Sequence, residues 1–361
     1  MYTLLAFVSI FGIIVFLHEL GHFLAARSVG VRVDKFYVGF DFFGLGYKVH
    51  ESNGTEYGIG LFPFGGYCKI AGMVDESLDD TVTGGDDEFN SKNTMQKLWI
   101  LSAGVIMNFL LAIILFFFVF IVYGQSTLAP VAYNIIDDKP AFNAGIEPGS
   151  TITAINGKEV FEWSDISKNL SSISKERMIT VDYIFNDQYK QVRLEPEIIK
   201  DGNGKRGIIG IERVPDDIIQ LHVDKYIIFQ KVGFLKAIEM SFVAPLSIIS
   251  LQIGGLSQLI SGDVGLDNLG GPIKITQMAG EAAKFGAAYF LQFMAMISTI
   301  LGFMNILPIP GLDGGHGLMT IIEGLSQRKI PLKIKMGIQQ FAVLLILGLT
   351  FFILINDIRN L

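Results

Sequence analysis

Long apolar runs separated by polar stretches dominate the pattern of this chain. Asp, Glu, Lys and Arg are absent from residues 98–136, 285–312 and 336–356, and also from the first 17 residues. An α-helix needs roughly 20 apolar residues to span a bilayer, and the three longest runs all exceed that length. We therefore predict a polytopic α-helical membrane protein with four transmembrane helices, in residues 1–27, 98–123, 288–312 and 337–361.

A further uncharged run covers residues 240–262, but Pro245 and Gly254-Gly255 interrupt it, and it contains several serines and glutamines. We predict that residues 216–287 form an amphipathic region on the membrane surface, or a re-entrant segment, and not a fifth span. The position of a candidate metal ligand, given below, supports this choice.

The polar stretches show strand and turn patterns. Asn53-Gly54 lies between two strand-like runs, residues 47–52 and 55–61, so the loop 28–97 is predicted to contain a β-hairpin with a type I′ turn. Residues 124–215 alternate in the same way around Asn156-Gly157 and Asn186-Asp187, and predict a small α/β domain inserted between two membrane helices.

The composition agrees with a membrane protein, because only 17% of the residues are charged, against about a quarter in soluble domains. The net charge of −7 and the absence of a Lys/Arg run argue against nucleic-acid binding. The single cysteine, Cys68, rules out an internal disulfide. A signal peptide begins with positive charge, which Met1-Tyr2-Thr3 lacks, so we expect an uncleaved first helix.

Positive residues in short loops mark the cytoplasmic side of a membrane protein. Arg27, Arg32 and Lys35 follow the first helix, and four Lys or Arg residues lie between 328 and 335. Residues 28–97 and the connection 313–336 are therefore predicted to be cytoplasmic. The domain 124–215 and both chain ends are then on the outer side.

His18, Glu19 and His22 are the first candidates for chemistry. Polar residues inside a membrane helix are costly and are retained mainly where they function. The i, i+4 spacing lets both imidazoles bind one metal ion, with Glu19 placed to take a proton from water. The alternative is a helix end with chance polar residues. A catalytic zinc needs a third protein ligand, and Ser28 occupies the position where soluble relatives of this motif place a histidine.

Asp313 is the best candidate for the third ligand, because it follows two prolines and precedes two glycines in "NILPIPGLDGGHG". Its alternative role is a cap at a membrane boundary. With four spans, Asp313 returns to the membrane side that carries His18 and His22. A full crossing at residues 240–262 would place it on the opposite side.

The sequence resembles the site-2 protease family of bacterial PDZ-containing intramembrane zinc metalloproteases, of the type that regulates sigma-E. The matching motifs run in the family's order along the whole chain: His18-Glu19-Leu20-Gly21-His22, Phe64-Gly65-Gly66-Tyr67, Ala103-Gly104, Asn108-Phe109, Asn268-Leu269-x-Gly271-Pro272 and Asn305-x-x-Pro308-x-Pro310-x-Leu312-Asp313-Gly314-Gly315. The resemblance implies one Zn²⁺ per chain held by His18, His22 and Asp313, with Glu19 as the base.

The resemblance also implies a substrate-binding role for Asn305 and Asn108, and a PDZ domain in residues 124–215. Two departures are evident: Val105 replaces the family's usual proline, and one PDZ-like unit is evident where enterobacterial relatives have two. Whether the PDZ-like domain binds a new C-terminus or excludes bulky ectodomains stays open.

A transmembrane substrate must be unwound before cleavage, and its freed backbone groups then need partners. The strand at residues 55–61 and the following glycines offer an edge for strand addition. An ordinary loop hairpin is the alternative. The predicted substrate contacts in this region are Gly58, Ile59, Gly60, Gly65 and Gly66.

The expected function is therefore intramembrane cleavage of single-span proteins, such as anti-sigma factors or signal-peptide remnants, after a first cut by a site-1 protease. The expected location is the bacterial inner membrane, with the PDZ-like domain on the periplasmic side. A metal transporter and an inactive PDZ-bearing adaptor are the alternatives. We expect His316 to support the ligands and Cys68 to be an ordinary loop residue.

Overall fold

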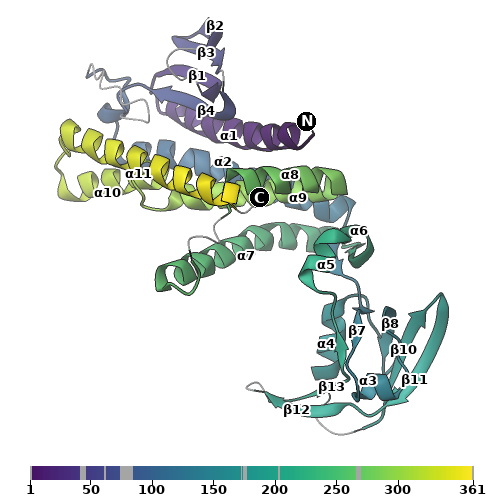
Figure 1. Ribbon diagram of the computed structural model, residues 1–361. Coiled ribbons are helices and arrows are strands. Elements are labelled where there is room, and N and C mark those ends of the chain that lie inside the picture. The colour runs from purple at the N-terminus through teal and green to yellow at the C-terminus, as the bar shows by residue number, and fades with distance from the viewer. Residues whose placement is uncertain are drawn as a thin grey trace. The chain divides into compact units, whose positions relative to one another are not determined.

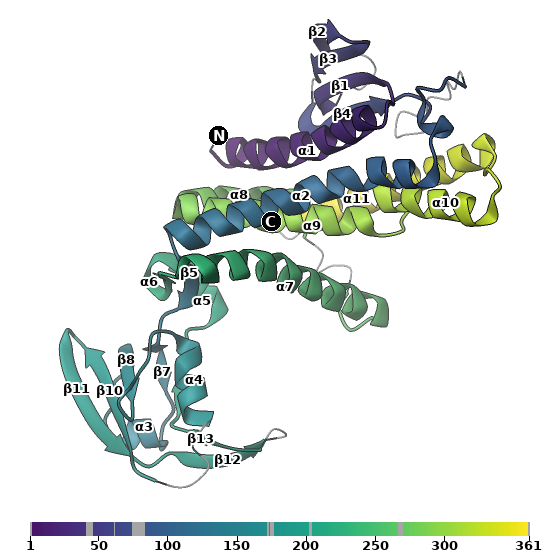
Figure 2. The same cartoon turned by 180° about the vertical axis from the view of Figure 1, so that it is seen from behind.

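The computed structural model describes residues 2–40, 46–60, 62–73, 84–171, 173, 177–201, 204–265 and 270–359 (Figures 1 and 2). Asn268 and Leu269 of the resemblance lie outside these residues. The chain divides into two compact units. The first combines Met1–Ile121 with Gly233–Leu361, and the second is Val122–Val232.

Helices form most of the first unit. They are α1 (Tyr2–Ser28), α2 (Thr94–Val122), α7 (Phe234–Ser261), α8 (Pro272–Phe285), α9 (Ala287–Ile306), α10 (Asp313–Ser326) and α11 (Leu332–Arg359). Within the described part of the chain, α1, α2, α7, α9 and α11 are long and apolar enough to cross a membrane. Four of these correspond to the predicted spans, and α7 is an additional candidate by length and composition.

The predicted loop at 313–336 is wrong over its first half, because α10 begins at Asp313 itself. The two glycines after Asp313 suggested a sharp turn, and both lie within the first turn of the helix. Near the helix end, Glu323 accepts hydrogen bonds from the Ile330 N–H (2.7 Å) and from Lys335 Nζ (2.8 Å). Burial acts to raise the pKa of Glu323, but these two contacts lower it overall.

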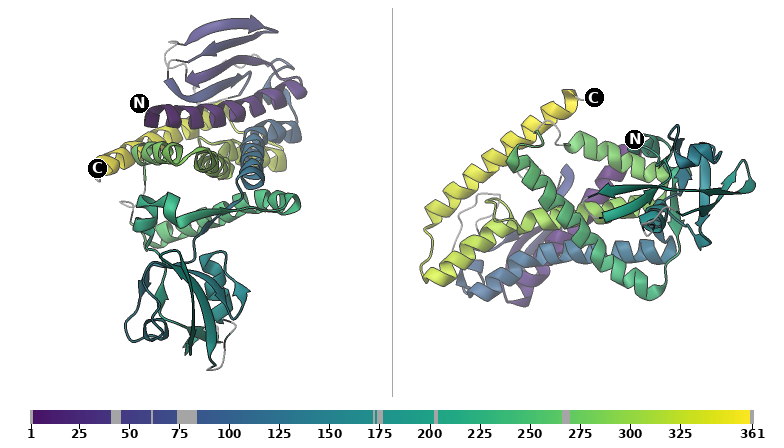
Figure 3. Two further views of the ribbon diagram at one scale, coloured as in Figure 1. Left: turned by 90° about the vertical axis from the view of Figure 1, so that its right-hand side faces the viewer. Right: turned by 90° about the horizontal axis from the view of Figure 1, so that it is seen from below.

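A four-stranded sheet lies on one side of α1, and α2 and α9 lie on the other (Figure 3, left). Its strands are β1 (Val33–Phe40), β2 (Tyr47–Ser52), β3 (Thr55–Ile59) and β4 (Phe62–Ile70). The predicted hairpin is confirmed: Asn53 and Gly54 have φ of 51° and 73°, as a type I′ turn requires.

The order of this sheet is β2-β3-β1-β4. β3 pairs with β2 on one side and runs parallel to β1 on the other. The hairpin therefore offers an edge only at β2, whereas β3, at which we expected strand addition, is paired on both sides. β4 is the edge strand that contacts α1, and its buried Cys68 and Ile70 pack with Ile100 and Ala25 of the helices. Cys68 thus belongs to a strand and not to a loop.

Helices α1, α8 and α9 share a second apolar core. Ile10 and Ile14 of α1 are fully buried and pack with Ala279 of α8 and with Phe293 and Ile297 of α9. Since the same face of α1 continues toward His18, this core fixes the helix that carries the motif.

The second unit contains the predicted α/β domain but extends beyond residue 215. Residues 216–232, which we predicted to be part of the amphipathic membrane-associated region, belong to this unit. Its main sheet has the order β11-β10-β8-β6, with β9 paired to β8. The elements are β5 (Gln125–Leu128), β6 (Val131–Ala132), β7 (Asn134–Ile135), α3 (Pro140–Asn143), β8 (Ser150–Ile155), β9 (Lys158–Glu159), α4 (Trp163–Ser171), β10 (Ile179–Phe185), β11 (Gln188–Leu194), β12 (Glu197–Asp201), β13 (Gly204–Ile208), β14 (Ile211–Glu212), α5 (Asp216–Leu221), α6 (Val223–Tyr226) and β15 (Ile227–Gln230). The turns predicted at Asn156-Gly157 and Asn186-Asp187 are present, with positive φ at all four residues. β5 and β15 pair and hold the two ends of the unit together.

Candidate metal centre and active-site pocket

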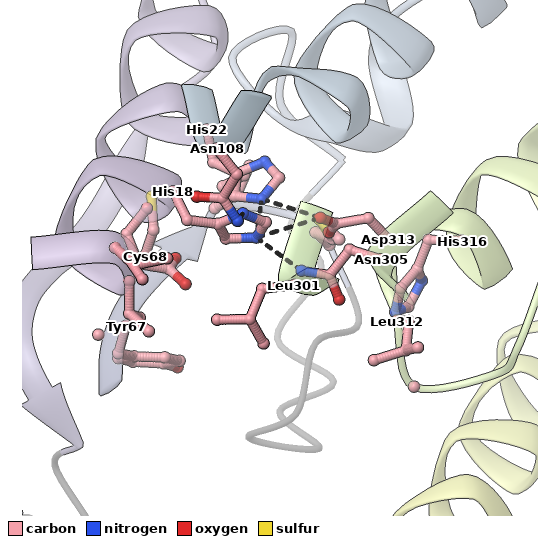
Figure 4. Close-up of a pocket in the computed structure, with 17 residues that line it drawn as sticks. His18, His22, Tyr67, Cys68, Asn108, Leu301, Asn305, Leu312, Asp313 and His316 are labelled. Carbon is pink, nitrogen blue, oxygen red and sulfur yellow. Dashed lines mark hydrogen bonds and ion pairs between the residues drawn. The ribbon is translucent and has the colours of Figure 1, made fainter. Parts of the chain in front are cut away.

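Helix α1 presents two imidazole rings from one face near its C-terminal end (Figure 4). His18 and His22 are one turn apart and are 9% and 7% exposed. Their Nε2 atoms lie 3.2 Å from each other. An i, i+4 pair points in one direction from a helix, so a third residue facing both nitrogens completes a site.

Asp313 is that residue, although nearly 300 positions separate it from His18. Its Oδ2 lies 3.2 Å from Nε2 of His18 and 3.3 Å from Nε2 of His22. Helix α9 ends at Ile306, the chain passes through two prolines, and Asp313 then opens α10. The structure therefore brings together the three residues that the sequence singled out.

The glycines after Asp313 allow the preceding loop to fold back onto the start of α10. A Cβ on Gly314 would lie 2.2 Å from the Ile306 carbonyl oxygen, and one on Gly315 would lie 2.3 Å from that of Ile309. Both obstacles are backbone atoms that a side chain cannot push aside. The Asp-Gly-Gly order is thus a steric requirement of the turn that aims Asp313.

The donor set fits a zinc ion. A tetrahedral ion with ligands at about 2.0–2.1 Å separates its ligand atoms by about 3.3–3.4 Å, and the three measured separations are 3.2, 3.2 and 3.3 Å. The buried Oδ2 of Asp313 has no hydrogen-bond partner within the described residues. Two imidazoles and one carboxylate are also the ligand types of a catalytic zinc site, which keeps a fourth position open.

Helix α2 supports both rings from behind. Nδ1 of His22 donates a hydrogen bond to the Ile100 carbonyl oxygen at 2.8 Å, and Nδ1 of His18 lies 3.2 Å from Nδ2 of Asn108. Gly104 lies between these contacts, and a Cβ there would approach Nε2 of His22 to 2.4 Å. The absence of a side chain at Gly104 therefore lets the rings sit against α2.

Glu19 lines the same pocket, a cavity of about 200 Å³ that opens beside the three ligands. A Cβ on Gly66 would lie 2.7 Å from Cγ of Glu19, so strand β4 packs directly on this side chain. From the other side, Nδ2 of Asn305 lies 3.4 Å from Nε2 of His18 (Figure 4). A potential base and a potential amide donor thus flank the metal position.

The other predicted substrate contacts divide into two groups. Gly66 and Asn108 line the pocket, and Gly65 precedes Gly66 in the edge strand β4. Gly58, Ile59 and Gly60 are not among the pocket-lining residues. Gly58 instead packs beneath Tyr37, whose ring a Cβ would approach to 2.3 Å.

Sequence reasoning missed several residues of the pocket wall. Tyr67 and Met73 contribute from the sheet side and Leu301 from α9. Leu301 lies one turn before Asn305 on the same helical face, and that spacing could have identified it. His316, which we expected to support the ligands, also lines the cavity.

The chain is similar along nearly its whole length to known proteins. The model of peptidase family M50 matches residues 6–349. A Helicobacter pylori protein named "Putative zinc metalloprotease" is 31% identical over 354 residues, which cover 96% of this chain and 97% of that protein. The "Regulator of sigma E protease" of Haemophilus influenzae is 27% identical over 448 residues, covering 100% of this chain and 99% of that protein. "Protease RseP" of Yersinia pestis is 28% identical over 459 residues, with 100% and 99% coverage.

Proposed function

The chain belongs to peptidase family M50, the site-2 protease family, and we propose that it is a zinc metalloprotease that cleaves transmembrane segments of single-span membrane proteins. The observation that carries the proposal is the triangle formed by His18, His22 and Asp313, with Glu19 in the same pocket. His18, Glu19 and His22 lie on α1, and Asp313 follows the end of α9; both helices are apolar enough to span a bilayer. A hydrolytic centre in such helices has membrane-embedded peptide bonds as its natural targets.

The side chains around the centre suggest a division of work. Zinc, when bound by the two histidines and the aspartate, supplies a Lewis acid that polarises a carbonyl group and activates water. Glu19 accepts the proton from the attacking water and passes it to the leaving nitrogen. Asn305 offers an amide beside the open position and stabilises the substrate backbone.

The edge strand β4 is the better candidate for substrate addition. A substrate helix hides its carbonyl groups in i→i−4 hydrogen bonds, so its scissile segment must become extended before attack. β4 ends the sheet order, and Gly66 and Tyr67 of this strand line the cavity. If an extended substrate pairs with β4, this strand supplies hydrogen-bond partners to the substrate backbone at the position where Glu19 acts.

The arrangement of the helices supports four spans. The residues around the metal position lie in the C-terminal half of α1, in the first half of α2 and at the C-terminal end of α9. α2 therefore leaves the catalytic side and α9 returns to it, which requires an even number of crossings between them. If α7 crossed, α8 would have to return, but its 14 residues extend only about 21 Å, against a bilayer core of about 30 Å. We propose that α7 lies along the membrane.

The proposed setting follows from this topology. The positively charged segment 328–335 and the sheet next to α1 lie on the cytoplasmic side, and the second unit is a PDZ domain on the periplasmic side of the inner membrane. Substrates are anti-sigma-like proteins or signal-peptide remnants that a site-1 protease has already shortened.

The test compares the wild type with Glu19→Gln on a tagged single-span substrate, with zinc content measured for both proteins. We expect Glu19→Gln to retain zinc and to lose cleavage, because it keeps the ligands but removes the base. Equal cleavage by the two proteins would refute the protease assignment.

A further inference from the structure

Asn108 lies behind the metal position, on the far side of His18 from Asp313. The residue is on α2, and it is 1% exposed. Its Nδ2 is 3.2 Å from Nδ1 of His18, and its Oδ1 is buried without a hydrogen-bond partner among the described residues. A buried amide with one unsatisfied atom needs an explanation.

His22 provides an internal reference for the geometry of His18. Its Nδ1 faces the Ile100 carbonyl oxygen at 2.8 Å, and a carbonyl oxygen only accepts hydrogen bonds. Nδ1 of His22 therefore carries the proton, and in the neutral ring Nε2 presents its lone pair toward Asp313. Each ligand histidine in a metal site commonly donates its second N–H to such an acceptor.

The same requirement applies to His18. Its Nε2 faces Asp313 at 3.2 Å, and a nitrogen that binds a metal carries no proton. The proton is then on Nδ1, which needs an acceptor, while the amide group that faces it is a donor. Rotating the Asn108 amide by half a turn exchanges Oδ1 and Nδ2. This rotation places Oδ1 of Asn108, which lacks a donor, next to Nδ1 of His18, which lacks an acceptor.

The position of Asn108 is also fixed from α9. Ser298 is fully buried and donates its hydroxyl to the Asn108 carbonyl oxygen at 2.8 Å. Gly302, one turn further along α9, leaves room for Asn108, since a Cβ there would lie 3.3 Å from the Asn108 Cβ. The amide is thus held between α1 and α9, in contact with the ligand ring.

We propose that Asn108 is a positioning residue whose Oδ1 accepts a hydrogen bond from Nδ1 of His18, and thereby fixes the ring tautomer that binds the metal. This inference rests on the zinc centre of the proposed function. It changes the predicted role of Asn108 from contacting the substrate to orienting a ligand. The chemistry requires an acceptor at this position, whatever substrate is bound.

The experiment measures zinc affinity of the full-length protein in detergent by competition with a chromophoric chelator. Asn108→Leu removes the acceptor with little change in size, and we expect it to weaken zinc binding about 10–100-fold, as losses of such ligand-supporting groups do. Asn108→Asp can accept but not donate, and we expect zinc affinity at or above that of the wild type. Equal weakening in both variants would overturn the proposal, because it would mean that the amide acts as a donor.

Two further variants separate positioning from packing and from substrate binding. Ser298→Ala loses the contact to the Asn108 backbone but leaves the amide in place, and should change zinc affinity less than threefold. Asn305→Ala, which touches His18 from the pocket side, should lose cleavage and keep zinc affinity. If Asn108→Leu does not fold, the Asp variant still decides. Its Co²⁺-substituted form should show the tetrahedral absorption bands of the wild type, and their loss would refute the acceptor role.

The outcomes distinguish this inference from the proposed function. A wild type that binds no zinc overturns the zinc centre itself. A wild type that binds zinc, with Asn108→Leu binding it equally well, overturns only the role of Asn108.

Discussion

The substitution Gly104→Ala should empty the metal centre while leaving α2 intact. A Cβ at this position would lie 2.4 Å from Nε2 of His22 and 2.7 Å from Cε1 of His18. Carbon atoms in contact prefer separations of about 3.5 Å or more, so the His22 ring would have to move by about 1 Å. Metal sites tolerate errors of only about 0.2 Å in ligand distance.

The rings cannot simply turn away from the added methyl group. Nδ1 of His22 is held by the Ile100 carbonyl, and Nδ1 of His18 contacts Asn108. A ring that moves away from the methyl group must lose either its contact with α2 or its position next to Asp313. Displacements of about 1 Å at a catalytic centre reduce rates about 100-fold, and we expect at least that loss of cleavage, together with loss of zinc.

Alanine favours a helix interior over glycine by roughly 0.5–1 kcal/mol, which offsets part of the overpacking cost of about 1–3 kcal/mol, so we expect α2 to stay folded. The assay is zinc content after gel filtration, with circular dichroism as the measure of folding. Gly12→Ala is the matched control, since no atom lies within 4 Å of its added Cβ. Stoichiometric zinc and normal cleavage in Gly104→Ala would refute the packing argument.

Three other predictions address the substrate strand, the second unit and α7. Neighbouring strand residues point their N–H groups to opposite sides of the strand, so only one of Tyr67 and Cys68 can direct its N–H toward the substrate. Either Tyr67→Pro or Cys68→Pro should therefore cut cleavage at least tenfold with zinc retained, while Val49→Pro in β2, at the opposite edge of the sheet, should not. Full activity in both β4 variants would contradict substrate pairing with β4. The Lys190 hydrogen bond at 2.5 Å lowers the pKa of Glu147, so the pair stabilises the fold above the unfolded carboxyl pKa of about 4.3 and loses this effect as pH falls through the lower folded value. Lys190→Met should accordingly reduce the hydrogen-exchange protection of β10 and β11 at pH 7, and the difference in protection from the wild type should shrink below about pH 4. A difference that stays constant with pH would mean that the effect comes from packing and not from the ion pair. Cysteines placed along α7 in a cysteine-free chain should be labelled from outside at every third or fourth position, whereas one protected block of about 20 residues would indicate a fifth span.

The meeting of His18, His22 and Asp313 was largely predictable because it follows from short-range and topological rules. The i, i+4 spacing of His18 and His22 fixes their common face whatever the rest of the fold. The side of the membrane on which Asp313 emerges follows from the number of crossings. The support from α2 was not predictable in the same way, because Ile100 acts through a backbone carbonyl that its side chain does not reveal.

The sheet shows where sequence reasoning fails. The hairpin around Asn53-Gly54 is a local feature, and its turn chemistry predicts it correctly. The insertion of β1 between β3 and β4 is a long-range pairing that leaves no periodic signal. It pairs β3 on both sides and leaves β4 as the edge strand next to α1. The start of α10 was not predicted for a different reason: the two prolines and two glycines favour a turn, but the glycines, which a close backbone approach requires, lie in the first turn of a helix.

Two glycines on facing helices explain how the proposed metal centre fits between α1 and α2. Gly21 lies within the HExxH motif, and a Cβ there would be 2.5 Å from the Ala103 carbonyl oxygen. Gly104, the next residue on α2, has no side chain where His18 and His22 pass. Each helix therefore has a glycine where atoms of the other helix come close. The His18 and His22 rings can then approach α2 closely enough for their Nδ1 atoms to contact Asn108 and Ile100. The His-Glu-Leu-Gly-His and Ala-Gly motifs, which begin 85 residues apart at His18 and Ala103, are in this sense one steric unit, and the proposed metal-binding geometry depends on both.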